Sequence, residues 1–212
     1  MAECCGCGST LELARLQASQ RRVLVAVLSI NLLTFVLMLL GAWHSGSAAL
    51  LSGSLDNLGD ALTYALSLAV VGASAAAKAR VALFKAALIL AAALAVAAGI
   101  GWKLAHPQAP LFQSMGLAAG LNFAANLVCL GLLWRYRHGD INLASAWACS
   151  LNDVYEGVAV LVAAAAVWLF GAGWPDLVVA LALLALFLRS AWRVARAAWR
   201  QPGQPAADVS QD

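Results

Sequence analysis

The sequence predicts an all-α membrane protein, a bundle of six transmembrane helices with both termini in the cytoplasm. Of its 212 residues, 63% are apolar and only 11% are charged, whereas about a quarter of the residues of a soluble domain carry charge. Six apolar runs approach the twenty or so residues that cross a bilayer as a helix. These runs do not alternate between apolar and polar residues, as the strands of a membrane barrel do.

The six expected spans follow one another with short breaks. They are Val23–Gly41, Leu50–Gly72, Val81–Gly101, Leu111–Trp134, Leu143–Phe170 and Trp174–Trp192. The breaks contain the Gly, Pro, Ser and charged residues that end helices. We therefore expect residues 21–198 to form the transmembrane domain, residues 1–20 a cytoplasmic tail that contains cysteines, and residues 199–212 a disordered tail.

Positively charged residues set the expected orientation. Lys and Arg precede the first span, lie between the second and third and between the fourth and fifth, and follow the sixth, while Lys103 alone lies on the opposite side. Because Lys and Arg are enriched on the cytoplasmic face, both termini are expected there, in a bilayer that we take to be a bacterial inner membrane. The sequence has no basic patch with interleaved aromatic residues, so no nucleic-acid partner is expected.

Acidic residues lie inside two of the expected spans. Asp56 and Asp60 are four residues apart, and Cys149 and Asp153 repeat that spacing in the fifth span. Side chains at this spacing share one helix face, about 6 Å apart along the axis. Charges at bilayer depth are costly and usually mark an ion path or a proton relay. Together the four groups would complete a tetrahedral shell around a divalent metal, and the thiolate favours zinc or cadmium.

Neighbouring polar residues are expected to support these pairs. Asn57 and Asn152 would supply an amide oxygen or a hydrogen bond to a ligand, while Glu156 would either relay protons or face a partner helix. Packing between helices is the expected role of Asn31, Asn122, Asn126 and Cys129. Packing would also account for any single aspartate, or for Cys149 as a small apolar residue, but it does not require two matched pairs.

Three cysteines crowd the N-terminal tail, at Cys4, Cys5 and Cys7. Adjacent cysteines cannot cross-link a fold, so a reducing compartment is expected. Three roles stay open for them: capture of soft metal ions for delivery to the bundle, lipidation, or none beyond that of a flexible tail.

The stretch GAWHSGSAALLSGSLDNLGDAL, residues 41–62, resembles the second-helix segment of the cation diffusion facilitator family of metal/proton antiporters. In that family a small-residue loop leads into a His-or-Asp-x-x-x-Asp pair, which Asp56 and Asp60 match. Residues 141–176 resemble the fifth helix and the start of the sixth, where the family usually carries His-x-x-x-Asp.

In the fifth-helix segment Cys149 stands at the position of the family's histidine and Asp153 at that of its aspartate, and Asp176 matches an acid in the following turn. A shifted alignment would pair Asn152 with Glu156 instead. The family's histidine-rich inner loop has no counterpart here, nor does its cytoplasmic C-terminal domain. Any homodimer is therefore expected to form through membrane helices.

The resemblance implies efflux of divalent transition-metal cations from the cytoplasm in exchange for protons. The metal, zinc or cadmium by expectation, would be the transported substrate and not a cofactor, and the protein would not be an enzyme. Two other classes stay open from the residues themselves: an intramembrane zinc metalloenzyme that uses the same ligands, and a structural membrane protein that transports nothing.

Overall fold

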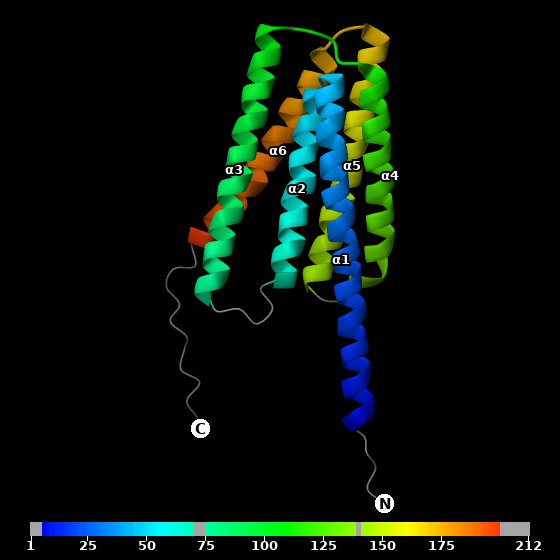
Figure 1. Cartoon of the computed structure of the whole chain (residues 1–212), viewed down its shortest axis with the longest axis vertical. Coiled ribbons are helices and arrows are strands. Elements are labelled where there is room, and N and C mark those ends of the chain that lie inside the picture. The colour runs from blue at the N-terminus through cyan, green and yellow to red at the C-terminus, as the bar shows by residue number, and fades with distance from the viewer. Residues whose placement is uncertain (1–5, 70–74, 139–140, 200–212) are drawn as a thin grey trace, which may run out of the picture.

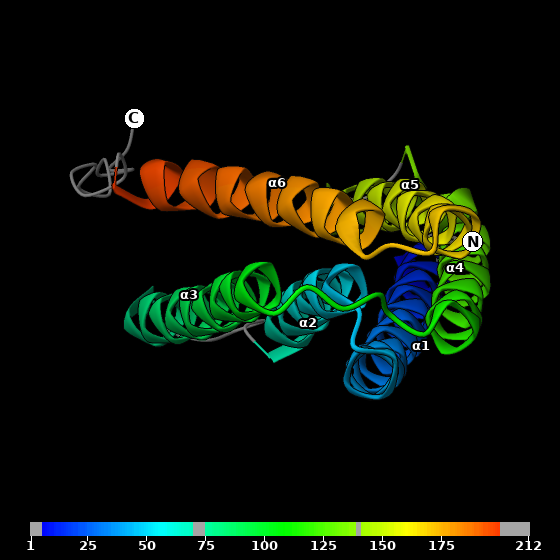
Figure 2. The same cartoon turned by 90° about the horizontal axis from the view of Figure 1, so that it is seen from above.

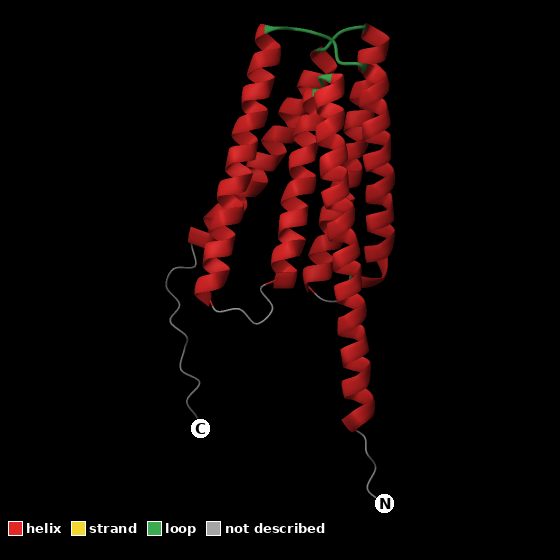
Figure 3. Cartoon of the chain, viewed as in Figure 1, coloured by secondary structure: helices red, strands yellow, loops and turns green. Residues whose placement is uncertain are grey.

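The computed structural model describes residues 6–69, 75–138 and 141–199, with side chains from Ala18 to Arg189 apart from stretches near residues 66–92 and 141–145. These residues form six α-helices and one short 3-10 helix, without strands (Figures 1 and 3). The elements are α1 (Gly6–Ser45), α2 (Ala48–Ala69), α3 (Ala75–Ala105), α4 (Phe112–Leu133), η1 (Trp134–Tyr136), α5 (Ile141–Phe170) and α6 (Trp174–Trp199). The predicted all-α fold is confirmed, and each predicted span overlaps one of the described helices.

The first helix is longer than the predicted span. It begins at Gly6, so most of the stretch expected as a tail before the membrane domain continues α1 without a break. No Gly or Pro occurs between Gly8 and Gly41 to interrupt it. Cys4 and Cys5 lie outside the described residues, as do the side chain of Cys7 and the expected disordered tail from residue 200 onward.

The helices run alternately up and down, so α1 begins and α6 ends at the same end of the bundle (Figure 1). We call this the inner end, and we call the opposite end, which carries the α1–α2, α3–α4 and α5–α6 connections, the outer end. Viewed from above, α1, α2, α4 and α5 form a compact group, while α3 lies against α2 and α6 and away from α1 and α4 (Figure 2).

Small residues allow the helices of the compact group to approach closely. A Cβ atom added at Gly41 of α1 would lie 2.6 Å from the Cβ of Ala118 on α4. A Cβ atom at Gly157 of α5 would lie 3.1 to 3.5 Å from side-chain and backbone atoms of Phe123 on α4. In a bilayer, where lipid is as apolar as leucine, such close contacts are a main source of helix association.

The outside of the bundle is apolar. Leu33, Leu94, Leu117 and Val162 are each more than 60% exposed, which in water would be unfavourable but in lipid is the expected arrangement. Among the described residues, three segments are long and apolar enough to cross a membrane: Ala18–Ser45, Phe112–Tyr136 and Ala146–Phe170. Exposed tryptophans lie near both ends, with Trp43, Trp102, Trp168 and Trp174 at the outer end and Trp134 at the inner end, as in the aromatic belts of membrane proteins.

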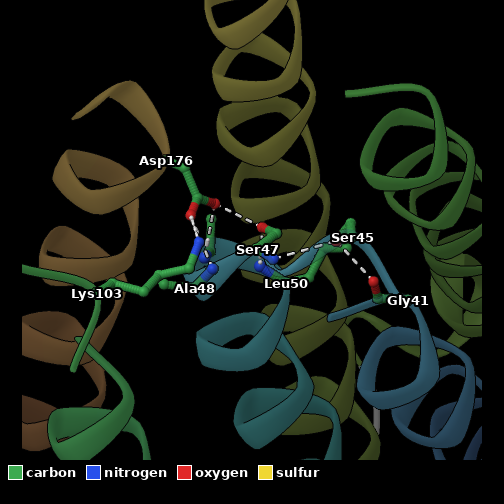
Figure 4. Close-up of polar contacts among 8 residues, drawn as sticks. Gly41, Ser45, Ser47, Ala48, Leu50, Lys103 and Asp176 are labelled. Atoms are coloured by element: carbon green, nitrogen blue, oxygen red, sulfur yellow. Dashed lines mark hydrogen bonds and ion pairs between the residues drawn. The ribbon is translucent and has the colours of Figure 1, made fainter. Parts of the chain in front are cut away.

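A buried carboxylate ties three helices together at the outer end (Figure 4). Asp176, in the first turn of α6, is completely buried. Its Oδ1 accepts hydrogen bonds from the hydroxyl of Ser47 (2.5 Å) and the backbone N–H of Ala49 (3.0 Å). Its Oδ2 accepts from the backbone N–H of Ala48 (2.8 Å) and pairs with the ammonium of Lys103 (3.1 Å). We call these five residues the outer clasp.

The outer clasp explains two features of the sequence. The N-terminus of α2 carries unpaired N–H groups and a partial positive charge, both of which a carboxylate satisfies. Lys103 is the one cation on the side opposite to the other Lys and Arg residues, and its position follows from its ion pair with Asp176. The clasp thereby fixes the start of α2, eight residues before Asp56.

Candidate functional site

The two predicted pairs face each other where α2 packs against α5. Because the two helices are antiparallel, the first member of one pair meets the second member of the other. Asp56 interacts electrostatically with Asp153, and Asp60 lies within reach of the thiol of Cys149. The pairs therefore form two levels, an upper level toward the outer end and a lower level about one helical turn below it.

A small cavity lies at the upper level, between α2, α4 and α5, with Met38 of α1 also in its lining. Its volume is about 10 Å³, close to the roughly 10–15 Å³ that one water molecule requires on the same measure. The polar residues that line it are Asp56, Asn57, Asn122, Asn126, Asp153 and Glu156. Three carboxyl groups and three amides thus line a space about the size of one water molecule, although the carboxyl groups are not close enough together to hold one ion jointly.

Asp153 is the most constrained of these acids. It is 4% exposed, and among the described residues neither of its carboxylate oxygens has a hydrogen-bond partner. A buried carboxylate without partners is unfavourable by several kcal/mol unless it binds a proton or a cation. Asp153 is therefore a group to which either a proton or a cation could bind.

At the lower level a tyrosine joins the predicted pair. The hydroxyl of Tyr64 donates to Oδ2 of Asp60 (3.0 Å) and lies 3.4 Å from the carbonyl oxygen of Ala146 on α5. Tyr64 is 2% exposed, so its hydroxyl is held inside the bundle. Tyr64 was not predicted as a site residue, although it follows Asp60 at the same four-residue spacing that marked the acids.

The predicted supporting residues take different positions. Asn57 is buried and donates from Nδ2 to Oδ1 of Asn122 on α4 (2.9 Å), which ties α2 to α4 beside the cavity. Asn152 is exposed and donates to Oε1 of Glu156 (2.8 Å). Glu156 itself lines the cavity, so of the alternative pair in α5 only the carboxylate reaches it.

The four predicted ligands do not surround one point. Within the described part of the chain, no three His, Cys, Asp or Glu side chains lie close enough to hold one ion together. The reason is geometric, because side chains four residues apart on one helix are separated by about 6 Å along its axis. Side-chain rotation or a closer approach of α2 and α5 would be needed, and a site formed jointly by Asp56, Asp60, Cys149 and Asp153 stays a prediction.

Helix α4 contributes more to this region than the sequence analysis expected. Asn122 does bond between helices, as predicted, but Asn126 lines the cavity without a hydrogen-bond partner among the described residues. Cys129 is fully buried in a cluster with Tyr64 and lies within electrostatic range of Asp60 and Asp153. The three α4 residues repeat every three to four positions, which was a signal that they share one face.

A family model described as the cation efflux transmembrane domain matches residues 24–201, a range that includes the whole region around the cavity and reaches all six helices. A comparison with curated proteins finds no match.

Proposed function

The chain belongs to the cation efflux family, and from that membership we propose that it exports divalent transition-metal cations from the cytoplasm in exchange for protons. Efflux of cations and a location within the membrane follow from the family and from the apolar helices. Zinc and cadmium are the substrates that we propose, with the metal as cargo. The family is one of transporters, not of enzymes.

The observation that carries this proposal is the position of Asp153. Among the described residues no N–H or O–H group donates to either of its buried oxygens, and it lines the same small cavity as Asp56 and Glu156. Three carboxyl groups in one small space repel one another when ionised and are stabilised by a cation or by protons. Since metal binds only the deprotonated groups, the two occupants compete. This competition is the chemical basis of exchange.

The transport cycle follows from that competition. A cation from the cytoplasm displaces protons from the carboxyl groups of α2 and α5, with Asp60 and Cys149 at the lower level as further ligands. The bundle then reorients so that the cavity communicates with the outer side, where protons displace the cation and the protonated carrier returns. We place the inner end in the cytoplasm because Arg21, Arg22 and Arg135 lie toward it.

The test is flux into liposomes that contain the purified full chain. With Zn²⁺ outside and a zinc indicator and a pH indicator inside, the wild-type chain is expected to carry zinc inward and protons outward. Asp153→Asn keeps the shape of the side chain but not its charge, and we expect the zinc flux to fall at least tenfold. Tyr155→Phe, two residues away on the exposed face of α5, is the control and should transport like the wild type.

Two results would contradict the proposal. Zinc transport by Asp153→Asn at the wild-type rate would exclude the carboxyl groups as the exchange site. Zinc flux through the wild-type chain without any movement of protons would leave cation transport intact and exclude antiport.

A further inference from the structure

The burial of Asn126 has no explanation within the helices themselves. This residue of α4 is 0% exposed, and neither Oδ1 nor Nδ2 of its amide has a hydrogen-bond partner among the described residues. Leaving a buried polar group unpaired costs about 1–3 kcal/mol, and lipid offers no replacement. Asn122, one turn away, shows the contrast, because its oxygen accepts a hydrogen bond from Asn57. The amide of Asn126 is therefore available to a ligand.

The place to which Asn126 contributes is the cavity already described. It lines that space together with Asp56, Asp153 and Glu156, and the two oxygens of Asp153 likewise have no hydrogen-bond donor among the described residues. Unpaired polar groups from α4 and α5 thus meet beside a third helix, in a volume of about 10 Å³. The surplus of carboxyl groups makes a cation the favoured occupant.

Building on the proposed function, we infer that Asn126 contributes its amide oxygen to the transported cation, so that α4 is the third wall of a site otherwise formed by α2 and α5. No hydrogen bond from the described part of the chain fixes the amide, so it is free to turn its oxygen toward the ion. An amide oxygen adds a ligand without adding a charge, so it strengthens binding without adding a group that protons must neutralise during release.

The chemistry of this ligand also predicts a preference among cations. A carbonyl-type oxygen suits harder cations, whereas a thiolate suits softer ones. Removal of the Asn126 oxygen should therefore weaken binding of Zn²⁺ more than binding of Cd²⁺, for which the thiol of Cys149 is the better ligand. A purely structural role for the amide, such as holding one water molecule, would affect both ions alike.

The experiment measures Zn²⁺ and Cd²⁺ binding to the purified full chain in detergent by titration calorimetry. For Asn126→Leu we expect the Kd for Zn²⁺ to rise about tenfold, within the range that loss of a supporting polar group costs a metal site, and the Kd for Cd²⁺ to rise less. Asn126→Asp restores an oxygen and should bind Zn²⁺ at least as tightly as the wild type. Asn31→Leu removes a fully buried amide that does not line the cavity and should stay within about twofold of the wild type.

Unchanged Zn²⁺ binding by Asn126→Leu, an equal loss in Asn31→Leu, or an equal loss for both ions would overturn this inference while leaving the proposed function standing. A wild-type chain that binds neither ion would overturn both. If Asn126→Leu does not fold, as judged by its elution on size exclusion, Asn126→Ala gives the same comparison with a smaller side chain.

Discussion

The outer clasp allows a quantitative test of the fold through the variant Asp176→Asn. Each carboxylate oxygen of Asp176 accepts from two donors: Oδ1 from Ser47 and Ala49, and Oδ2 from Ala48 and Lys103. An asparagine has the same shape but presents one oxygen and one NH₂ group. In either orientation of the asparagine side chain, its NH₂ group faces two of the four donors, and the negative charge is lost.

The size of the effect follows from these contacts. The least costly orientation directs the NH₂ group toward Ser47, whose hydroxyl can turn and accept, and leaves the N–H of Ala49 without an acceptor. Hydrogen bonds to a charged group are worth about 1.5–3 kcal/mol each, so we expect the free energy of unfolding to fall by about 2–4 kcal/mol. At about 2–4 °C per kcal/mol for a chain of this size, Tm should fall by about 4–16 °C.

The measurement is thermal unfolding of the purified chain in detergent, followed by tryptophan fluorescence. Lys103→Met is the matched control, because it removes the ion pair but leaves Asp176 with its other three donors. Asp176 is completely buried, but the side chain of Lys103 is 19% exposed and the carboxylate keeps three of its four donors, so the Tm of Lys103→Met should fall by less than that of Asp176→Asn. An equal fall in both variants would refute the assignment of the clasp's stability to the buried hydrogen bonds.

Two further predictions concern α4 and α5. Gly157→Val should lower the free energy of unfolding by about 1–3 kcal/mol, because its new side chain meets Phe123, whereas Gly120→Val, with nothing within 4 Å of an added Cβ, should unfold near the wild-type Tm. In a chain whose N-terminal cysteines are replaced by serine, half-buried Cys149 should react with a maleimide faster than fully buried Cys129, and saturating Cd²⁺ should slow that reaction severalfold. If Cd²⁺ leaves the labelling rate of Cys149 unchanged, its thiol is not a ligand of the cation.

The fold was predictable because lipid leaves few alternatives. In lipid every backbone N–H and C=O group must be paired, either within a helix or between the strands of a closed barrel. A run such as Val81–Gly101, which does not alternate between apolar and polar residues, is therefore predicted as a helix. The start of α1 was not predictable in this way. The Cys-rich stretch is too polar to be a span, but nothing in it after Gly8 breaks a helix, and hydropathy reports where a helix meets lipid, not where it begins.

The candidate site was predictable in part. The spacing of Asp56 and Asp60, repeated by Cys149 and Asp153, identified the two helices that face each other, because spacing within a helix is fixed by its geometry. Asn126 was assigned to packing, since spacing along one helix does not say which neighbour a polar face meets. That depends on how α4 sits against α5, which small residues such as Gly157 decide by allowing close approach.

The outer clasp can form only late in synthesis, after α6 has been made. Chains enter the membrane from the N-terminus onward, and Asp176 belongs to the last helix, more than 120 residues after Ala48. Before α6 is inserted, the N–H groups at the start of α2 and the ammonium of Lys103 lack the carboxylate of Asp176. Before α5 is inserted, Asp56 and Asp60 lack Asp153 and Cys149 opposite them. A chain truncated before Asp176 therefore cannot form the clasp. The clasp is complete only when α2, α3 and α6 are all in position.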